Sequence, residues 1–192
     1  MPGADKSNGY EAHAEDFMRA RDHWIGVAAV KSWAAMLKPG ARVLELGCGH
    51  GIISQGLIDE GVDLYVIDAS PSLLAAFRAR FPQVPAECAA VEDSGFFGCT
   101  FDGVVAWGLM FLLSPQAQRD LIQKVSTVLG PGGKFLFTSP AEVGGWRDAL
   151  TGTASISLGV EEYRRALCEA GLRVTEENED EGGNYYYSAV KG

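Results

Sequence analysis

The sequence predicts an α/β fold in which helices cover both faces of a seven-stranded, mostly parallel sheet. Three observations predict it. Short apolar segments alternate with helical segments between residues 42 and 171. Ser-Pro pairs at residues 70–71 and 114–115 mark the starts of two of these helices. The last two apolar segments are separated only by a short acidic turn, so one of those two strands should be antiparallel.

The N-terminal part of the chain has the spacing of helices. From Ala14 to Leu37 apolar side chains recur every three or four residues. Gly26 interrupts this pattern, which predicts two helices rather than one. A turn at Pro39 and Gly40 then leads into the first strand.

The predicted strands are short apolar segments bounded by turn residues. In chain order they are ARVLEL, DLYVID, VPAECAAV, FDGVVAWG, KFLFTS, LRVTEEN and NYYYSAV. The helices expected between them are IISQGLIDEG, SPSLLAAFRARF, SPQAQRDLIQKVSTVL and GVEEYRRALCEAG. No linker divides the chain, and 192 residues suffice for one sizeable core, so we expect a single domain over residues 1–192.

Composition argues against several classes of protein. A formal charge of −9 without a basic stripe disfavours a nucleic-acid partner. No apolar run approaches the ~20 residues that a membrane span needs, and the acidic N-terminus does not resemble a signal peptide. We therefore expect a cytoplasmic protein that does not bind a membrane. Four scattered cysteines without a C-x-x-C pair predict reduced thiols and no metal site.

The most informative segment is VLELGCGHG at residues 43–51, where glycines follow the first strand at every second position. Glycines here allow a tight turn and close approach of a ligand to the backbone. The spacing is G-x-G-x-G rather than the G-x-G-x-x-G that binds a pyrophosphate. Glu45 precedes the first glycine by two residues and would repel a phosphate but favour a cation.

Asp68 ends the second strand, 17 residues after Gly51. A carboxylate at this place can accept hydrogen bonds from both hydroxyls of a ribose. The two acids together predict a ligand with a nucleoside, a positive group and no phosphate. S-adenosylmethionine has this composition.

At these residues the sequence resembles the class I S-adenosylmethionine-dependent methyltransferases. The resemblance covers nearly the whole chain, because the family's segments occur in order: LELGCGHG, VIDAS, AAVED, FDGVVAWGLMFLL, VLGPGGKFLFTSP and EEYRRALCEAGL. It implies a three-layer Rossmann-like sandwich. It also implies a cofactor site that includes Glu45, Gly47, Cys48, Gly49, Gly51, Asp68 and Ala69.

The resemblance extends the site to two further segments. The family's aspartate for the adenine amine corresponds to Ala90, so adenine recognition is expected at the Val91 backbone and the Glu92 side chain. Ala106 and Trp107 should line the methionine end, where an aromatic face favours a sulfonium. No catalytic acid or base can be assigned from the sequence.

The family's N-terminal helices fold over the cofactor, which implies that residues 1–37 cover the site of a core at residues 38–192. Arg21 lies on the apolar stripe and needs an anionic partner, for which the cofactor carboxylate would serve. Tyr10 is the expected aromatic residue of this lid. Residues 140–159 are expected to form an acceptor-side loop, with Trp146 and Arg147 as candidate contacts.

We therefore expect methyl transfer by in-line displacement to an oxygen or nitrogen of a small-molecule acceptor. Three alternatives stay open: a non-catalytic protein that binds the cofactor, an NAD-dependent oxidoreductase, and a methyltransferase with a macromolecular acceptor. The oligomeric state and the identity of the acceptor do not follow from the sequence.

Overall fold

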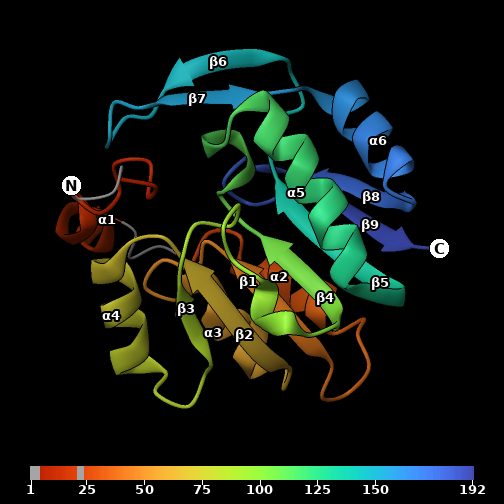
Figure 1. Ribbon diagram of the computed structural model, residues 1–192, viewed down its shortest axis with the longest axis horizontal. Coiled ribbons are helices and arrows are strands. Elements are labelled where there is room, and N and C mark those ends of the chain that lie inside the picture. Colours follow the sequence, from red (N-terminus) through yellow and green to blue (C-terminus); the bar gives the residue numbers. More distant parts are fainter. Residues whose placement is uncertain (1–4, 21–23) are drawn as a thin grey trace.

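The computed structural model describes residues 5–20 and 24–192, and its core is one seven-stranded sheet (Figure 1). The strand order is β3-β2-β1-β4-β5-β9-β8. The strands are β1 Arg42–Leu46, β2 Asp63–Asp68, β3 Ala86–Cys88, β4 Phe101–Ala106, β5 Leu129–Thr138, β8 Leu172–Glu179 and β9 Tyr185–Lys191. Only β9 runs antiparallel to its neighbours in this sheet, which confirms the predicted fold class.

Helices cover both faces of the sheet. In Figure 1 helix α5 lies in front of the sheet, and α2 and α3 lie behind it. The helices are α1 Ala14–Ala20, α2 Val27–Ala34, α3 Ile52–Asp59, α4 Pro71–Arg80, α5 Pro115–Val128 and α6 Val160–Glu169, with short 3-10 turns at Phe96–Gly98 (η1) and Met110–Leu112 (η2). Two separate N-terminal helices form, as the position of Gly26 predicts.

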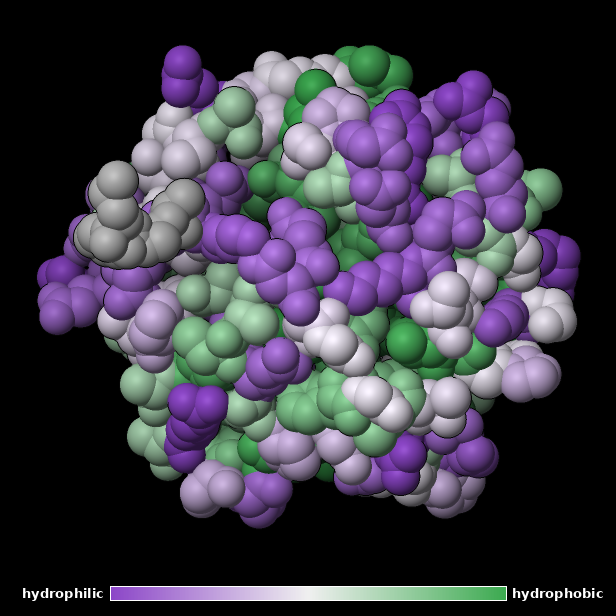
Figure 2. All heavy atoms as spheres, viewed as in Figure 1, coloured by the Kyte–Doolittle hydropathy of each residue, from purple (hydrophilic) through white to green (hydrophobic). Residues whose placement is uncertain are grey.

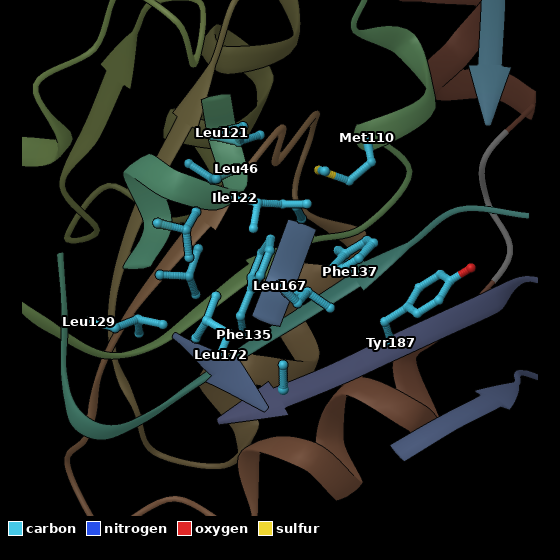
Figure 3. Close-up of a cluster of buried hydrophobic side chains, with 14 of the residues drawn as sticks. Leu46, Met110, Leu121, Ile122, Leu129, Phe135, Phe137, Leu167, Leu172 and Tyr187 are labelled. Atoms are coloured by element: carbon cyan, nitrogen blue, oxygen red, sulfur yellow. The ribbon is translucent and has the colours of Figure 1, made fainter. Parts of the chain in front are cut away.

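Alternating strand residues divide the core into two clusters. Leu44 and Val104 point to the face covered by α5 and α6, and their neighbours Val43 and Val105 point to the face covered by α2, α3 and α4. Figure 3 shows the first cluster, in which side chains from β5 and α5 interdigitate. The outer faces of α5 and α6 carry hydrophilic residues (Figure 2), as expected for helices with one buried side.

Two Ser-Pro helix starts form as predicted. Ser70 Oγ accepts a hydrogen bond from the Leu73 N–H, and Ser114 Oγ accepts one from the Ala117 N–H. Each serine satisfies a backbone donor that the first turn of a helix leaves unpaired. These caps fix where α4 and α5 begin, and both beginnings lie near the carboxyl ends of the strands.

The segment 140–159 differs from the expected loop. It contains a hairpin of β6 (Gly144–Arg147) and β7 (Ala154–Ser157), with Trp146 opposite Ser155. The side chains of β6 are all exposed, so no apolar alternation marked this strand in the sequence. Figure 1 shows the hairpin above the edge of the sheet toward which the arrows of β2 and β4 point.

Two further strand limits also differ. The third strand is shorter than VPAECAAV, because only Ala86–Cys88 pairs with β2. The fifth strand starts at Leu129 rather than Lys134, because Leu129 pairs with Phe101 ahead of a register shift. In the described residues no helix is long and apolar enough to cross a membrane.

A buried hydroxyl joins the elements below the hairpin. Tyr163 on α6 is fully buried, and its hydroxyl donates to Gln118 Oε1 of α5 at 2.6 Å. The hydroxyl oxygen of Tyr163 also lies 2.7 Å from Ser139 Oγ, just after β5, and it accepts a 3.3 Å hydrogen bond from the Leu158 N–H. Gln118 in turn donates to the carbonyl oxygens of Leu113 and Ile156, so one network fixes β7 against α5.

We expect Tyr163→Phe to lower the free energy of unfolding by about 1–3 kcal/mol, because it leaves buried polar partners unsatisfied. Urea unfolding measures this. Tyr65→Phe is the control, since the Tyr65 hydroxyl makes no hydrogen bond within residues 5–20 and 24–192. Equal losses in the two variants would contradict the role of the network.

Candidate functional site

A cavity of about 360 Å³ opens at the carboxyl ends of β1, β2 and β4. Its volume lies in the range of small-molecule sites, roughly 300–1,000 Å³. Its walls come from the N-terminal segment, the glycine turn and the segments that follow β2, β3 and β4. Of the residues expected from the sequence, those that line it are Tyr10, Glu45, Gly47, Cys48, Gly49, Asp68, Ala69, Val91, Glu92 and Trp107.

The glycine turn joins β1 to α3 in a backbone conformation that favours glycine. Gly47, Gly49 and Gly51 have φ values of 73°, 54° and 92°. The N–H groups of Gly47 and Cys48 both donate to the Ile67 carbonyl of β2, which holds the turn against the neighbouring strand. Gly47 and Gly49 line the cavity, where the absence of a Cβ leaves the backbone accessible to a ligand.

Gly51 does not line the cavity. A Cβ on Gly51 would lie 2.6 Å from Phe81 Cε2 and 2.9 Å from Phe77 Cδ2, and both rings are buried. This glycine is therefore required by the packing of the start of α3 against Phe77 of α4 and against Phe81, the residue that follows α4. Gly51 belongs to the motif, but in this structure its role is structural.

Glu45 lies at the inner end of the cavity and is almost fully buried. Its Oε2 accepts a hydrogen bond of 2.5 Å from Ser54 Oγ of α3. Burial raises the pKa of Glu45 to about 8, against the lowering effect of Ser54, and the negative charge of Asp68 raises it further. A buried carboxyl with this pKa is stabilised in its ionised form by a bound cation.

Asp68, at the end of β2, supports the glycine turn as well as lining the cavity. Its Oδ2 accepts from the Gly49 N–H at 2.7 Å, and its Oδ1 accepts from the Ser70 N–H at 2.8 Å. Burial raises the pKa of Asp68, and these two hydrogen bonds oppose the shift. Each carboxylate oxygen retains a second lone pair for a ligand hydroxyl.

The segment after β3 supplies the far wall of the cavity. Ala90, Val91 and Glu92 all line it. Lys124 Nζ of α5 donates to the carbonyl oxygens of Val91 and Glu92 at 2.7 and 3.2 Å, so these carbonyls are already engaged. The backbone N–H of Val91, in contrast to its carbonyl, makes no hydrogen bond within the described residues.

Trp107 lines the cavity, but its neighbour Ala106 does not. Ala106 is fully buried in the core cluster on the α5 side of the sheet. Trp107 packs against Tyr186 of β9, with 5.8 Å between ring centroids, and its indole lies directly over Gly26. The side chains of adjacent strand-end residues point in opposite directions, which places only Trp107 at the site.

Residues 5–20 lie across the mouth of the cavity and are tied to three loops. The Tyr10 hydroxyl donates to Asp148 Oδ2 at 3.0 Å, and Asn8 Nδ2 donates to the Leu112 carbonyl at 2.8 Å. Glu11 accepts hydrogen bonds from Ser70 Oγ and from the N–H and hydroxyl of Ser72, at the start of α4. Arg21, the expected partner of the cofactor carboxylate, lies outside the described residues.

Sequence reasoning missed several residues of this wall. Phe17 of α1 lines the cavity, and a Cβ on Gly49 would lie 3.3 Å from its ring. Phe17 belongs to the apolar spacing of α1, so a core residue was the simpler interpretation. The others that line the cavity include Lys6, Ser7 and Asn8, which no motif marks, and His50, Leu109 and Leu112, which lie inside the segments LELGCGHG and FDGVVAWGLMFLL but are not assigned to the site from the sequence.

A second cavity of about 450 Å³ lies beside the first, between the β6–β7 hairpin, the end of β5 and the turn before β9. Trp146 and Arg147, expected as acceptor-side residues, both line it. Two hydrogen bonds cross the boundary between the cavities. They are the Tyr10–Asp148 bond and a 2.7 Å bond from the Gly108 N–H to Thr138 Oγ1. Within the described residues no cluster of side chains is suited to hold a metal ion.

Comparison with known proteins identifies the core of the fold. Residues 43–133, from β1 into β5, match the family model described as "Methyltransferase domain". The matched residues are similar to a methyltransferase domain and make up just under half of the chain. The match includes the glycine turn, Asp68, the segment after β3 and Trp107.

Relatives of known sequence carry a similar description. An uncharacterized methyltransferase of Synechocystis sp. is 30% identical over 110 residues, which are 57% of this chain and 52% of the relative. The malonyl-[acyl-carrier protein] O-methyltransferase of Enterobacter lignolyticus is 31% identical over 148 residues, 73% of this chain and 57% of the relative. This chain thus spans little more than half the length of these two relatives, and only 37% of a related Mycobacterium bovis methyltransferase.

Solved structures show the same fold. The amino pentose methyltransferase CalS10 of Micromonospora echinaspora, solved with bound S-adenosylmethionine, matches with a TM-score of 0.73 at 21% identity. That match covers 93% of this chain and 96% of CalS10. The glycopeptide N-methyltransferase MtfA matches with a TM-score of 0.70 at 20% identity, over 87% of this chain and 94% of MtfA.

Gly51→Ala should lower the free energy of unfolding by about 2–4 kcal/mol, because a strained φ and a clash with two buried rings add together. Gly40→Ala is the matched control: Gly40 also has a positive φ of 68°, but a Cβ there meets nothing within 4 Å. That variant should lose only about 1–2 kcal/mol. Chemical denaturation compares the free energies of unfolding of the two variants. Equal losses would contradict the prediction, because they would show that the Phe77 and Phe81 rings move aside to accept the new Cβ.

Proposed function

We propose that this protein transfers a methyl group from S-adenosylmethionine to a small-molecule acceptor. The observation that carries the proposal is the placing of two buried carboxyls, Glu45 and Asp68, on one cavity beside an accessible glycine turn. Glu45 suits the ammonium of the cofactor and Asp68 suits its ribose hydroxyls. Neither suits a pyrophosphate, because like charges at contact distance repel.

The other walls of the cavity fit the remaining parts of this cofactor. The Val91 N–H and the Glu92 side chain belong to the cavity wall, and we assign the recognition of adenine by hydrogen bonds to them. Trp107 offers an aromatic face to the sulfonium, an attraction of roughly 0.5–2 kcal/mol. Tyr10 and Phe17 close the mouth, and their rings meet edge to face with centroids 5.2 Å apart.

When bound, S-adenosylmethionine supplies an activated methyl group that a nucleophile takes by in-line displacement at carbon. The residues of this chain contribute binding, alignment and exclusion of water. The glycine turn and the two carboxyls fix one end of the reacting pair, and the N-terminal segment, tied to Asp148 and Ser70, keeps water out. Alignment of this kind supplies effective molarities of roughly 10⁵–10⁸ M.

Similar proteins act on both kinds of acceptor. Relatives include O-methyltransferases of ubiquinone biosynthesis and of malonyl-[acyl-carrier protein], and the structurally similar MtfA is a glycopeptide N-methyltransferase. This range supports methyl transfer and leaves open whether the acceptor atom is oxygen or nitrogen. An acceptor small enough to enter the second cavity, of about 450 Å³, is favoured over a macromolecule.

Calorimetric titration with S-adenosylmethionine, S-adenosylhomocysteine and NADH tests the cofactor. We expect micromolar binding of the first two and none of NADH. Asp68→Asn should weaken binding at least tenfold, because an amide cannot accept two ribose hydroxyls while it holds the Gly49 and Ser70 N–H groups. The control is Asp63→Asn at the opposite end of β2. Unchanged affinity in Asp68→Asn would remove the ribose assignment.

Cofactor binding should also release a proton. With a pKa of about 8, Glu45 is mostly protonated at pH 7 in the empty protein. An ammonium favours the ionised carboxylate and lowers this pKa, so binding at pH 7 should release up to roughly 0.9 proton. Titrations in buffers of different ionisation enthalpy measure the release.

Methylthioadenosine, which has no ammonium group, serves as the control ligand and should release much less. Glu45→Gln should abolish the difference between the two ligands. A proton release that is the same for both ligands in the unmodified protein would contradict the placing of the ammonium at Glu45.

A further inference from the structure

The second cavity shares a boundary with the proposed cofactor cavity. The Tyr10–Asp148 and Gly108–Thr138 hydrogen bonds join residues of the first cavity to residues of the second. A molecule in the second cavity therefore lies beside the end of the first cavity that Trp107 and Gly108 line. This is the position that an acceptor would take before transfer.

Aromatic side chains supply flat apolar surface in the second cavity. Phe111, in the η2 turn, and Trp146, on β6, pack with ring centroids 5.4 Å apart. Tyr185 at the start of β9 lines the opposite side. The exposed fraction of Trp146 is 37%, so its ring is available to a ligand in spite of its contact with Phe111. These rings suit a planar or aromatic body.

Charged groups in the second cavity are mostly negative. Glu142, Asp148 and Glu179 line it, against one cation, Arg147. Neither Glu142 nor Glu179 forms a salt bridge within the part of the chain that the structure describes. Asp148 is ionised, because hydrogen bonds from Thr151, Tyr10 and Leu150 lower its pKa in spite of partial burial.

Arg147 does not balance these acids. Its Nη1 donates to the Gly152 carbonyl at 2.9 Å, across the β6–β7 hairpin, so one face of the guanidinium is engaged by the backbone. The phenol of Tyr185 is uncharged at neutral pH, as phenols ordinarily are, and burial and the nearby Glu177 raise its pKa further. The summed field in this cavity therefore attracts a cation and repels a carboxylate.

We propose that the second cavity is the acceptor site and that the acceptor is an amine whose ammonium group faces Glu142 and Glu179 while an aromatic body lies against Trp146. This inference rests on the proposed methyl transfer and adds the chemical class of the acceptor. The ammonium serves recognition only, because a protonated nitrogen has no lone pair. A second, neutral oxygen or nitrogen of the acceptor forms the bond to the methyl carbon, the carbon–sulfur bond breaks, S-adenosylhomocysteine leaves and the proton of the acceptor atom passes to water. The acidic lining also offsets the repulsion between the ammonium and the sulfonium.

The test uses the full chain saturated with S-adenosylhomocysteine and three probes that share one aromatic body. Tyramine carries an ammonium, tyrosol an uncharged hydroxyl, and 3-(4-hydroxyphenyl)propionate a carboxylate. Ligand-observed NMR titration at low salt measures the three affinities. We expect tyramine to bind about tenfold more tightly than the propionate, since two partly exposed charge pairs favour it. The preference should shrink as salt rises.

Two variants locate the site. The double variant Glu142→Gln, Glu179→Gln should remove the preference for tyramine, and Glu169→Gln, at the exposed end of α6, should keep it. Trp146→Ala should lower the affinity for all three probes by a similar factor. None of these variants should change the affinity for S-adenosylhomocysteine, because none of the substituted residues lines the first cavity.

Several results would overturn the proposal. They are binding of the propionate as tight as that of tyramine, no measurable binding of any probe, and a preference for tyramine that survives the double substitution. If S-adenosylhomocysteine itself fails to bind, the proposed function falls and the acceptor assignment falls with it. If the cofactor binds normally without a preference among the probes, only the acceptor assignment falls.

Discussion

The carboxylate of Asp68 holds the site together. It accepts the Gly49 N–H of the glycine turn through one oxygen and the Ser70 N–H ahead of α4 through the other. Two loops that follow neighbouring parallel strands are thereby fixed to each other. The cost is a buried carboxylate, which burial makes harder to ionise. The cavity exists in this shape because that cost is offset by two backbone hydrogen bonds.

The N-terminal segment depends on the same corner of the fold. Glu11 accepts hydrogen bonds from Ser70 and Ser72, so it attaches to the start of the helix that Asp68 helps to position. An acid at this place also benefits from the partial positive charge at the start of α4. Tyr10, the next residue toward the N-terminus, then reaches Asp148 beside the hairpin. One short segment thus connects the wall of the first cavity to that of the second.

A buried polar network supports the β6–β7 hairpin. Tyr163, Gln118 and Ser139 form a buried polar network that connects α6, α5 and the end of β5. Through Gln118 this network also bonds to the Ile156 carbonyl of β7. The exposed strand β6, with Trp146 and Arg147, is supported by its pairing with β7. The charge and aromatic character of the second cavity therefore depend on a scaffold that also bonds, through Gln118, to the Leu113 carbonyl in the wall of the first cavity.

The sequence by itself determined the sheet, its single antiparallel strand, the two Ser-Pro helix starts and many residues of the first cavity. The strands, the helix caps, the glycines and the two acids follow from local patterns, whereas Tyr10, Val91, Glu92 and Trp107 are implied only by the resemblance to a known family. Tertiary structure decided that Gly51 and Ala106 face the core rather than the cavity, because close packing against Phe77, Phe81 and the α5 side sets those directions. It also decided the hairpin, the Glu11 and Tyr10 attachments and the second cavity. Each of these depends on contacts between residues far apart in the chain, and no local pattern carries that information.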